Sequence, residues 1–428
     1  MKKIKNVAFI GLIFCCFNVF LSAQYHSKGK IVNVIGSDAR GYYQYLPFFF
    51  IKNDIKRQDY TYHFDNGTSF NKYTYGVALL QSPFFLVAYG YDSIVKQDLS
   101  GYGNLYAYSI IIATSCYLFF GLLLTFLLLS KWFNRITAWL SVMLLYGSTN
   151  MFFYSIVEPG ASHIYSFFCF SGFVYFVDRF YASPNFKNNL GAALFFAMAF
   201  LIRQTNAFII LFLLLYNVYS LKDVVTRIRF FMKEYKYAIT YVICIFILFL
   251  PQMLYWKALV NEYIVFAYKY SYSEESFLYW KSPKIFEVLF GTSCSWLPYT
   301  PIMAISLASL FYLAFKKQYQ AIPILLIFLL ALYTCASWWA YNFSCAFGYR
   351  PFVEYYSILI IPLAYLINSI LNMWGKTLLK SGFLILFLMF VFLNVSMTYE
   401  FKWEMWCGPD WNYEKYYEML SKIMRNVS

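Results

Sequence analysis

Charge is what this sequence has least of. Charged residues make up 13% of the 428-residue chain and hydrophobic residues 61%, whereas a soluble domain has roughly 25% charged and 45–50% apolar residues. Apolar runs follow one another from residue 7 to residue 399, with no long polar region that would form a separate soluble domain. The composition therefore excludes a soluble globular protein and predicts one continuous transmembrane domain over residues 1–428.

Metal-type cysteine spacing and internal repeats are also missing. The nine cysteines are scattered, and most lie in apolar runs, where cysteine acts as a small hydrophobic residue. We therefore expect no zinc site. Cys294, Cys345 and Cys407 fall in segments that we place outside the cytoplasm, so one disulfide can form among them if that compartment is oxidising. The lack of a repeat argues against transporter folds that are built from repeats.

The few charges that are present are mostly basic, and their positions predict the orientation of the chain. There are 34 Lys and Arg residues against 20 Asp and Glu residues. The basic residues cluster in short gaps between apolar runs, at 2–5, 131–135, 222–236, 316–317 and 376–380. Such gaps face the cytoplasm by the positive-inside rule. The positive charge thus sets the orientation, and we expect no nucleic-acid partner.

With these gaps inside, about eleven helices cross the membrane, and the N-terminus is cytoplasmic. The predicted fold class is an all-α polytopic membrane protein. The crossings are residues 7–23, 105–129, 136–154, 164–181, 189–219 as two short helices hinged near Arg203, 237–256, 296–315, 320–337, 352–370 and 381–399. The first of them can also be read as a signal peptide.

The segments between the crossings on the external side are long. Residues 24–104 form a first external loop that carries interfacial or re-entrant segments, among them residues 76–91, which are apolar but short. Residues 257–295 form a second external loop, and residues 400–428 form an external tail. This topology places a group of ionisable residues on the external side, and chemistry played no part in assigning it. They are Asp38, Arg40, Lys72, Glu158, His163, Arg203 and Arg350.

Asp38 lies in GSDARGYYQYLPFFF, an ionisable pair with two glycines, followed by an aromatic amphipathic run. A carboxylate at the membrane surface can accept a proton from an acceptor hydroxyl as a bond to that hydroxyl forms, which is the role of a general base. Two other interpretations stay open: a surface pair of Asp38 with Arg40, and an N-cap for a helix that begins near Tyr42.

Glu158 and His163 share a short external connection, SIVEPGASHIYSFF. A carboxylate and an imidazole at this spacing, beside Pro and Gly, can bind sugar hydroxyls or assist proton transfer. The same residues also suit a capped helix–turn–helix with Ser162 or Glu158 at the cap.

Two arginines are candidates for binding an anion. Arg203 lies between two apolar half-helices, where a cation is costly unless it faces a cavity, a partner or an anionic ligand. A phosphate there would gain charge-assisted hydrogen bonds, and snorkelling of the side chain to the interface is the alternative. Arg350 also lies at an outer helix start, where the alternative is an i,i+4 pair with Glu354.

Taken together, these segments resemble the GT-C superfamily of integral-membrane glycosyltransferases, near the branch of the protein mannosyltransferases and the aminoarabinose transferase that modifies lipid A. The order and the shared side of the motifs carry the resemblance. They are Asp38 with GYYQYLP, KYTYGVALLQSPFFLVAYG from Lys72, SHIYSFF at His163, IRQTN at Arg203 and FGYRPFVEYY at Arg350.

The resemblance implies transfer of a sugar from a polyprenyl-phosphate donor to an acceptor outside the cytoplasm, with inversion and without a nucleotide sugar. Asp38 matches the first-loop carboxylate, the expected base, and Glu158 is the second catalytic candidate. We expect the substrates to be bound by Arg40, Lys72, Tyr75, His163, Arg203 and Arg350. Lys72, Arg203 and Arg350 are the candidates for stabilising the departing lipid phosphate.

Some features leave the details of the reaction open. This chain lacks the second acidic residue beside the first-loop Asp and the proline in the stretch matching YTYG that many relatives have, so the acceptor can be a lipid, a glycan or a protein. A divalent cation near Asp38, Glu158 and His163 also stays open, although nothing in their spacing requires one. We expect a multi-pass protein surrounded by membrane lipids in the bacterial inner membrane, with its active site facing the periplasm.

Two other functions compete with transfer of a single sugar. A transporter or flippase of a lipid-linked saccharide would carry ionisable residues at mid-membrane depth, whereas the candidates here gather at one face, which favours the enzyme. A polymerase or ligase of surface glycans would share the donor chemistry.

Overall fold

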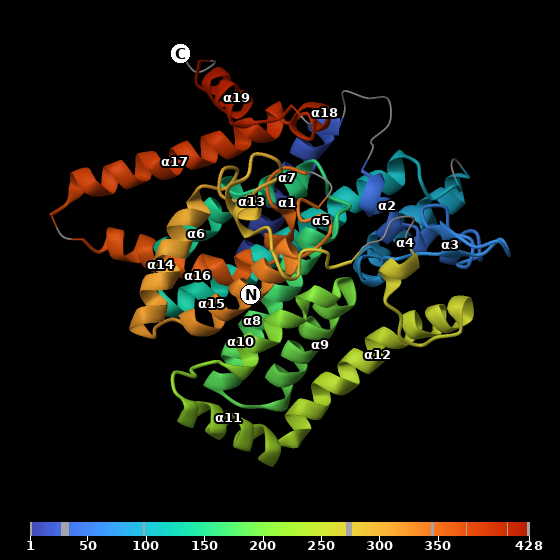
Figure 1. Ribbon diagram of the computed structural model, residues 1–428, viewed down its shortest axis with the longest axis horizontal. Helices are drawn as coiled ribbons and strands as arrows, with labels where there is room; N and C mark the ends of the chain where they lie inside the picture. Colours follow the sequence, from blue (N-terminus) through green and yellow to red (C-terminus); the bar gives the residue numbers. More distant parts are fainter. Residues whose placement is uncertain are drawn as a thin grey trace. The chain divides into compact units, whose positions relative to one another are not determined.

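The chain is built almost entirely of helices (Figure 1). The computed structural model describes residues 2–26, 34–96, 99–270, 276–343, 346–373, 375–408 and 410–425. In the described residues the longer helices are α1 (Lys2–His26), α4 (Gly76–Val95), α5 (Asn104–Trp132), α6 (Arg135–Gly147), α8 (Ser162–Ala182), α9 (Phe186–Ile202), α11 (Leu221–Lys233), α12 (Tyr235–Val260), α14 (Ile302–Lys316), α15 (Ala321–Ala336), α16 (Tyr356–Leu371), α17 (Thr377–Glu400) and α19 (Tyr413–Arg425).

Short helical segments and one small hairpin complete the described structure. The short helices are α2 (Ser37–Tyr43), α3 (Tyr45–Phe50), α7 (Met151–Ile156), η1 (Gln204–Ile209), α10 (Ile210–Leu214), η2 (Ala267–Tyr270), α13 (Ile285–Phe290), η3 (Arg350–Phe352) and α18 (Trp403–Trp406). Strands β1 (Tyr62–His63) and β2 (Ser69–Phe70) pair antiparallel, with Tyr62 opposite Phe70.

Among the described residues, four helices are long and apolar enough to cross a membrane: residues 6–26 of α1, and α5, α12 and α17. They have 21 to 29 residues, and about 20 residues are needed to span the hydrocarbon core. Shorter apolar helices are α9, η1 with α10, α14, α15 and α16. The chain is thus an integral membrane protein. Each predicted crossing falls on a helix or on a pair of short helices, and the number that spans the bilayer stays a prediction.

The first of two compact units comprises residues 1–122, 154–207 and 234–275. Within it, α9 packs against α8 and α12. Aromatic side chains fill these contacts: the rings of Phe168 and Phe195 are 5.3 Å apart, and those of Phe180 and Tyr237 are 5.0 Å apart. The segment predicted to be the first external loop belongs to the same unit, where α2, α3 and α4 pack together. Their shared core includes Tyr43, Phe70 and other buried aromatic residues.

The second unit comprises residues 123–153, 208–233 and 276–428. Helix α16 packs against α6, α14 and α15 in this unit, and α17 packs against α6 and α19. The buried Trp296 donates from Nε1 to the Tyr356 hydroxyl over 3.0 Å, and that hydroxyl donates to Asn150 Oδ1 over 2.6 Å. This chain of bonds satisfies the polar atoms at the start of α16.

The cysteines that we expected outside the cytoplasm have different states. Cys407 is disulfide-bonded. Cys294 is a buried free thiol, and its sulfur accepts a hydrogen bond from the Ala346 amide over 3.1 Å. Cys345 lies outside the described residues. A disulfide in this part of the chain is therefore confirmed, and Cys294 does not take part in it.

Candidate active site

Asp38 lies in the first turn of α2, whose N-cap is Gly36. The buried side of α2, formed by Ala39, Gly41, Tyr42 and Tyr43, holds the helix in the first unit. The Asp38 side chain is half-buried, and its Oδ1 accepts a hydrogen bond of 2.6 Å from the Tyr73 hydroxyl. The N-cap interpretation of Asp38 is wrong, because the helix begins before Asp38 rather than near Tyr42.

Tyr73 reaches Asp38 because residue 41 is a glycine. Gly41 lies three residues after Asp38, on the same face of α2, and a Cβ atom at Gly41 would collide with the Tyr73 ring. The Tyr42 ring covers another side of Tyr73, with the ring centroids 4.6 Å apart. Burial raises the pKa of Tyr73 well above its usual value, and the neighbouring Asp38 raises it further. The hydroxyl therefore stays protonated at neutral pH and donates to the carboxylate.

Asn71 fixes the segment that carries Tyr73. It is fully buried, and its Nδ2 donates to the Gly41 carbonyl over 2.8 Å and to Gln58 Oε1 over 2.7 Å. Its Oδ1 accepts from the Tyr73 amide over 3.0 Å, and its own amide donates to the Tyr255 hydroxyl over 3.0 Å. Asn71 thus joins α2 and the segment after the β-hairpin through its side chain, and it joins α12 through its backbone amide.

We expect Asn71→Ala to lower the free energy of unfolding by about 3 kcal/mol, because it leaves several buried polar groups without partners at about 1–3 kcal/mol each. The measurement is the thermal unfolding midpoint of the purified full chain in detergent. The control is Asn66→Ala. Asn66 is exposed and bonds only within its own turn, so this change should cost below about 1 kcal/mol. Equal midpoints for the two variants would show that Asn71 does not hold the loop.

Lys72 and Tyr75 flank Tyr73 and Thr74 in the chain, and the two residues make different contacts. The Lys72 Nζ is 5.6 Å from the ring centroids of both Tyr73 and Tyr268, within cation–π range. This places a positive charge beside the ring that bonds to Asp38. Tyr75 instead faces α12: its amide donates to Gln252 Oε1 over 3.0 Å, and its hydroxyl donates to the Leu248 carbonyl over 2.6 Å. In the structure Tyr75 docks the loop onto α12.

Thr74 connects the same segment to the end of α9. Its hydroxyl donates to the Leu201 carbonyl and lies 3.3 Å from the Ile202 carbonyl. These are among the last carbonyls of α9, which have no partner within the helix. The next residue, Arg203, is the half-buried C-cap with extended backbone (φ −151°, ψ 128°), and η1 begins at Gln204. The predicted break in the helix at Arg203 is therefore confirmed.

The bonds of residues 73 and 74 bring several predicted residues into one part of the first unit. Tyr73 bonds to Asp38, Thr74 bonds to the carbonyl just before Arg203, and Lys72 precedes both. Asp38 and Lys72 thus both contact Tyr73, and Thr74 ties the same segment to the backbone just before Arg203. Such a set of residues can accept a proton and bind an anion.

The connection that contains Glu158 packs directly on α2. A Cβ atom at Gly160 would come within 2.6 Å of the Ala39 Cβ, so only glycine allows the turn to approach the residue next to Asp38. Pro159 is fixed by the Thr114 hydroxyl, which donates to its carbonyl over 2.5 Å. Glu158 is half-buried in this turn, and its carbonyl accepts from the Ala161 amide over 3.0 Å.

His163 lies deeper than its position in the sequence suggested. It is the second residue of α8 and only 4% exposed, and its ring centroid is 5.0 Å from that of Tyr154. The N-cap of α8 is Ala161, with no side-chain hydrogen bond. The alternative in which Ser162 or Glu158 caps the helix is therefore wrong.

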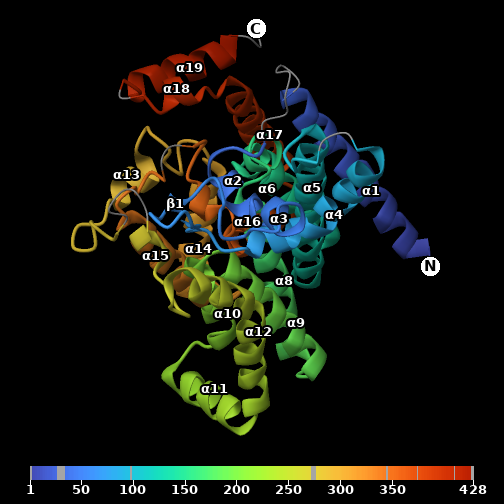
Figure 2. The ribbon, with the colours of Figure 1, turned by 90° about the vertical axis from the view of Figure 1, so that its right-hand side faces the viewer.

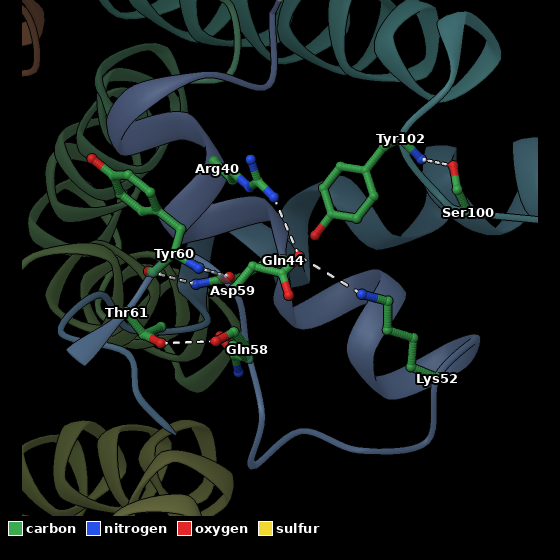
Figure 3. A network of polar contacts seen from close by, with 9 residues as sticks. All are labelled: Arg40, Gln44, Lys52, Gln58, Asp59, Tyr60, Thr61, Ser100 and Tyr102. Atoms are coloured by element: carbon green, nitrogen blue, oxygen red, sulfur yellow. Dashed lines mark hydrogen bonds and ion pairs between the residues drawn. The ribbon is translucent and has the colours of Figure 1, made fainter. Parts of the chain in front are cut away.

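Arg40 pairs with a carboxylate that the sequence analysis did not single out (Figure 3). Its Nη2 is 3.2 Å from Asp59 Oδ2, and the Lys52 Nζ is 3.7 Å from the same oxygen. The guanidinium also lies over the Tyr102 ring, 5.5 Å from its centroid. Burial raises the pKa of Tyr102, and the charge of Asp59 raises it further. The alternative interpretation, a surface pair of Asp38 with Arg40, is wrong, because the ion-pair partner of Arg40 is Asp59.

Arg350 belongs to the second unit. It is half-buried at the start of η3, where its carbonyl accepts from the Val353 amide over 3.2 Å. Its role in binding the lipid phosphate stays a prediction. As for metals, no group of three or more His, Cys, Asp or Glu side chains converges on one point among the described residues.

Comparison with known proteins supports one fold. No protein-family model and no curated protein sequence matches this chain. Among solved structures, the apo oligosaccharyltransferase of Archaeoglobus fulgidus is similar over 91% of this chain and 55% of its own, with a TM-score of 0.53 and 12% identity. The chain therefore shares the fold of that structure over the aligned part. It spans about half the length of that relative.

A second solved structure shows the same similarity. The archaeal oligosaccharyltransferase AglB from the same organism, in complex with an inhibitory peptide and a dolichol-phosphate, is similar over 92% of this chain and 55% of its own. The TM-score is 0.50 and the identity 12%. At this identity the likeness establishes a shared all-helical membrane fold.

Proposed function

We propose that the chain is an integral-membrane glycosyltransferase that moves a sugar from a polyprenyl-phosphate donor to a lipid, glycan or protein acceptor. The acceptor hydroxyl attacks the anomeric carbon, a new glycosidic bond forms, and the bond between that carbon and the phosphate oxygen breaks. Asp38 takes the hydroxyl proton, and the polyprenyl phosphate leaves with the bonding electrons. Attack opposite the leaving group inverts the anomeric carbon.

The observation that carries this proposal is the hydrogen bond between Asp38 and Tyr73. It fixes a half-buried carboxylate. The same segment carries the cation Lys72 beside Tyr73 and, through Thr74, bonds to the backbone just before Arg203. A base needs a defined position relative to the hydroxyl that it deprotonates. The shared fold supports the choice of donor, because one of the similar structures holds a dolichol-phosphate.

Positively charged side chains can stabilise the negative charge that develops on the leaving phosphate. Negative charge grows on the phosphate oxygen as its bond to the sugar breaks, and fixed positive charge at that position lowers the barrier. We assign this role to Lys72 and Arg203. Arg40 is already paired with Asp59, so we assign it to holding the loop. Glu158 and His163 are proposed to line the acceptor side.

The deciding experiment reconstitutes the full chain in vesicles with a radiolabelled polyprenyl-phosphate sugar and candidate acceptors. We expect label to appear in the acceptor and free polyprenyl phosphate to accumulate in equal amount. A flippase would move the intact donor across the bilayer and release no polyprenyl phosphate. A polymerase would extend a donor-linked saccharide and use no separate acceptor. Either of these results would overturn the proposal.

A further inference from the structure

Helix α11 exposes an apolar stripe. It has no buried residue, yet every third or fourth residue along one side is hydrophobic, the spacing of one helix face. The members of the apolar stripe are Leu221 (86% exposed), Val225 (46%), Ile228 (54%) and Met232 (72%). Nothing in the second unit covers this stripe among the described residues.

A second stripe runs alongside the first and is basic. Lys222, Arg229 and Lys233 are all exposed, and their spacing of seven and four residues puts them on one side of the helix. At about 100° per residue, this basic stripe lies directly next to the apolar stripe. The exposed half of α11 is thus divided lengthwise into a hydrophobic strip and a positive strip.

The opposite side of α11 is fixed to its own unit. Arg227 donates from Nη2 to the Tyr216 carbonyl over 2.6 Å and from Nη1 to the Leu213 carbonyl over 3.2 Å. At the start of the helix, Asp223 Oδ2 accepts from the Tyr219 amide over 3.0 Å. Burial lowers the pKa of Arg227 to about 10, which leaves the guanidinium charged at neutral pH. These bonds set which side of α11 faces outward.

The chain places α11 at a membrane surface. Residues 215–220 join it to α10, which ends at Leu214 and belongs to the shorter apolar helices. Two residues after Lys233 the chain begins α12, one of the helices that can cross the membrane (Figure 2). A helix tied at both ends to apolar segments stays close to the boundary between hydrocarbon and water.

We propose that α11 lies in the headgroup layer of the leaflet where α10 ends and α12 begins, and that it binds acidic phospholipid. The apolar stripe enters the acyl-chain boundary, as in interfacial amphipathic helices. The basic stripe meets the phosphates of acidic headgroups, and each basic side chain near such a surface adds attraction. The surface shares no residue with the candidate active site, so its test does not depend on the proposed enzymatic function.

The test uses the full chain in nanodiscs that contain phosphatidylglycerol and phosphatidylcholine, with a photoactivatable headgroup label on one lipid at a time. Crosslinked peptides of α11 are quantified by mass spectrometry after a non-tryptic digest. We expect labelling by phosphatidylglycerol to exceed labelling by phosphatidylcholine. The triple variant Lys222→Gln, Arg229→Gln, Lys233→Gln should lower this preference by roughly fivefold or more. Roughly fivefold is the effect expected for the loss of a single surface cation, and this variant removes three.

The matched control is Lys316→Gln, Lys376→Gln, Lys380→Gln, which removes the same charge from two other basic gaps. It should leave the preference at α11 unchanged within about twofold. Both variants keep Arg227, and equal thermal midpoints for wild type and triple variant show that the fold is intact. Equal labelling of α11 by the two lipids would overturn the proposal. So would the absence of lipid crosslinks on α11, which would mean that a protein surface covers the stripe.

Discussion

Asp38→Asn is expected to lower the turnover number for sugar transfer by about 10³-fold, within the range for removing a general base. Asparagine has nearly the shape of aspartate, and its side-chain oxygen can still accept the hydrogen bond from Tyr73. It cannot take up a proton from the acceptor hydroxyl at neutral pH. We therefore expect the KM for the polyprenyl-phosphate donor to change by less than about threefold. The measurement is the initial rate of the reconstituted protein.

The same chemical change at a neighbouring carboxylate is the control for Asp38. Asp59→Asn breaks an exposed pair with Arg40, and such pairs contribute about 1 kcal/mol or less. Its transfer rate should stay within about twofold of wild type. Tyr73→Phe removes only the bond that orients Asp38, so we expect about a tenfold loss of turnover. Transfer at the wild-type rate by Asp38→Asn would show that Asp38 is not the base.

Arg203→Gln is expected to lower turnover by about 10²-fold, because removing one preorganised donor to developing negative charge costs about that much. Arg203→Lys keeps the charge but not the planar fork of donors, so its loss should be smaller. Free polyprenyl phosphate should also inhibit Arg203→Gln more weakly than wild type, since the product carries the charge that Arg203 binds. The measurements are the turnover number and the inhibition constant of polyprenyl phosphate.

Arg179 supplies the control for Arg203. It is an exposed arginine in the last turn of α8, and its guanidinium donates to the Tyr175 hydroxyl over 3.1 Å. Arg179→Gln should leave both measurements unchanged. If Arg203 only snorkels to the interface, Arg203→Gln will behave in the same way as Arg179→Gln, and the assignment of Arg203 to phosphate binding fails.

The helical framework was predictable because bilayer thickness and hydropathy act on long segments. The break in the helix at Arg203 was predictable for a local reason: four polar residues interrupt an apolar stretch, and the structure ends α9 there. Asp38, Lys72 and Arg203 became candidates in a different way, because the charge-based topology placed them with other ionisable residues on one side of the membrane.

The contacts that unite these residues could not be predicted. Asn71, Tyr73 and Thr74 are ordinary residues in an aromatic loop, and their bonds to other segments reach residues 13 to 184 positions away in the sequence. No local pattern encodes bonds of that range, because they depend on how α2, α9 and α12 pack.

Two other features are visible as local patterns in the sequence. Asn66-Gly67 lies between β1 and β2, and Asn-Gly is the strongest short signal for a hairpin turn. The amphipathic spacing of α11 could likewise be read directly from residues 221–233, which were interpreted only as a basic cytoplasmic gap. Both show that a charge-based topology overlooks elements that lie along the membrane surface.

Tyr73 and Thr74 are neighbours in the chain, and this has a consequence for how the protein can change. One side chain orients the carboxylate, and the next caps the helix that ends at Arg203. The position of Asp38 and the position of the end of α9 therefore depend on two adjacent residues, which a single peptide bond joins. A substitution that shifts the end of α9 is therefore expected to move Tyr73 as well, so changes near Arg203 and changes near Asp38 are expected to affect one another.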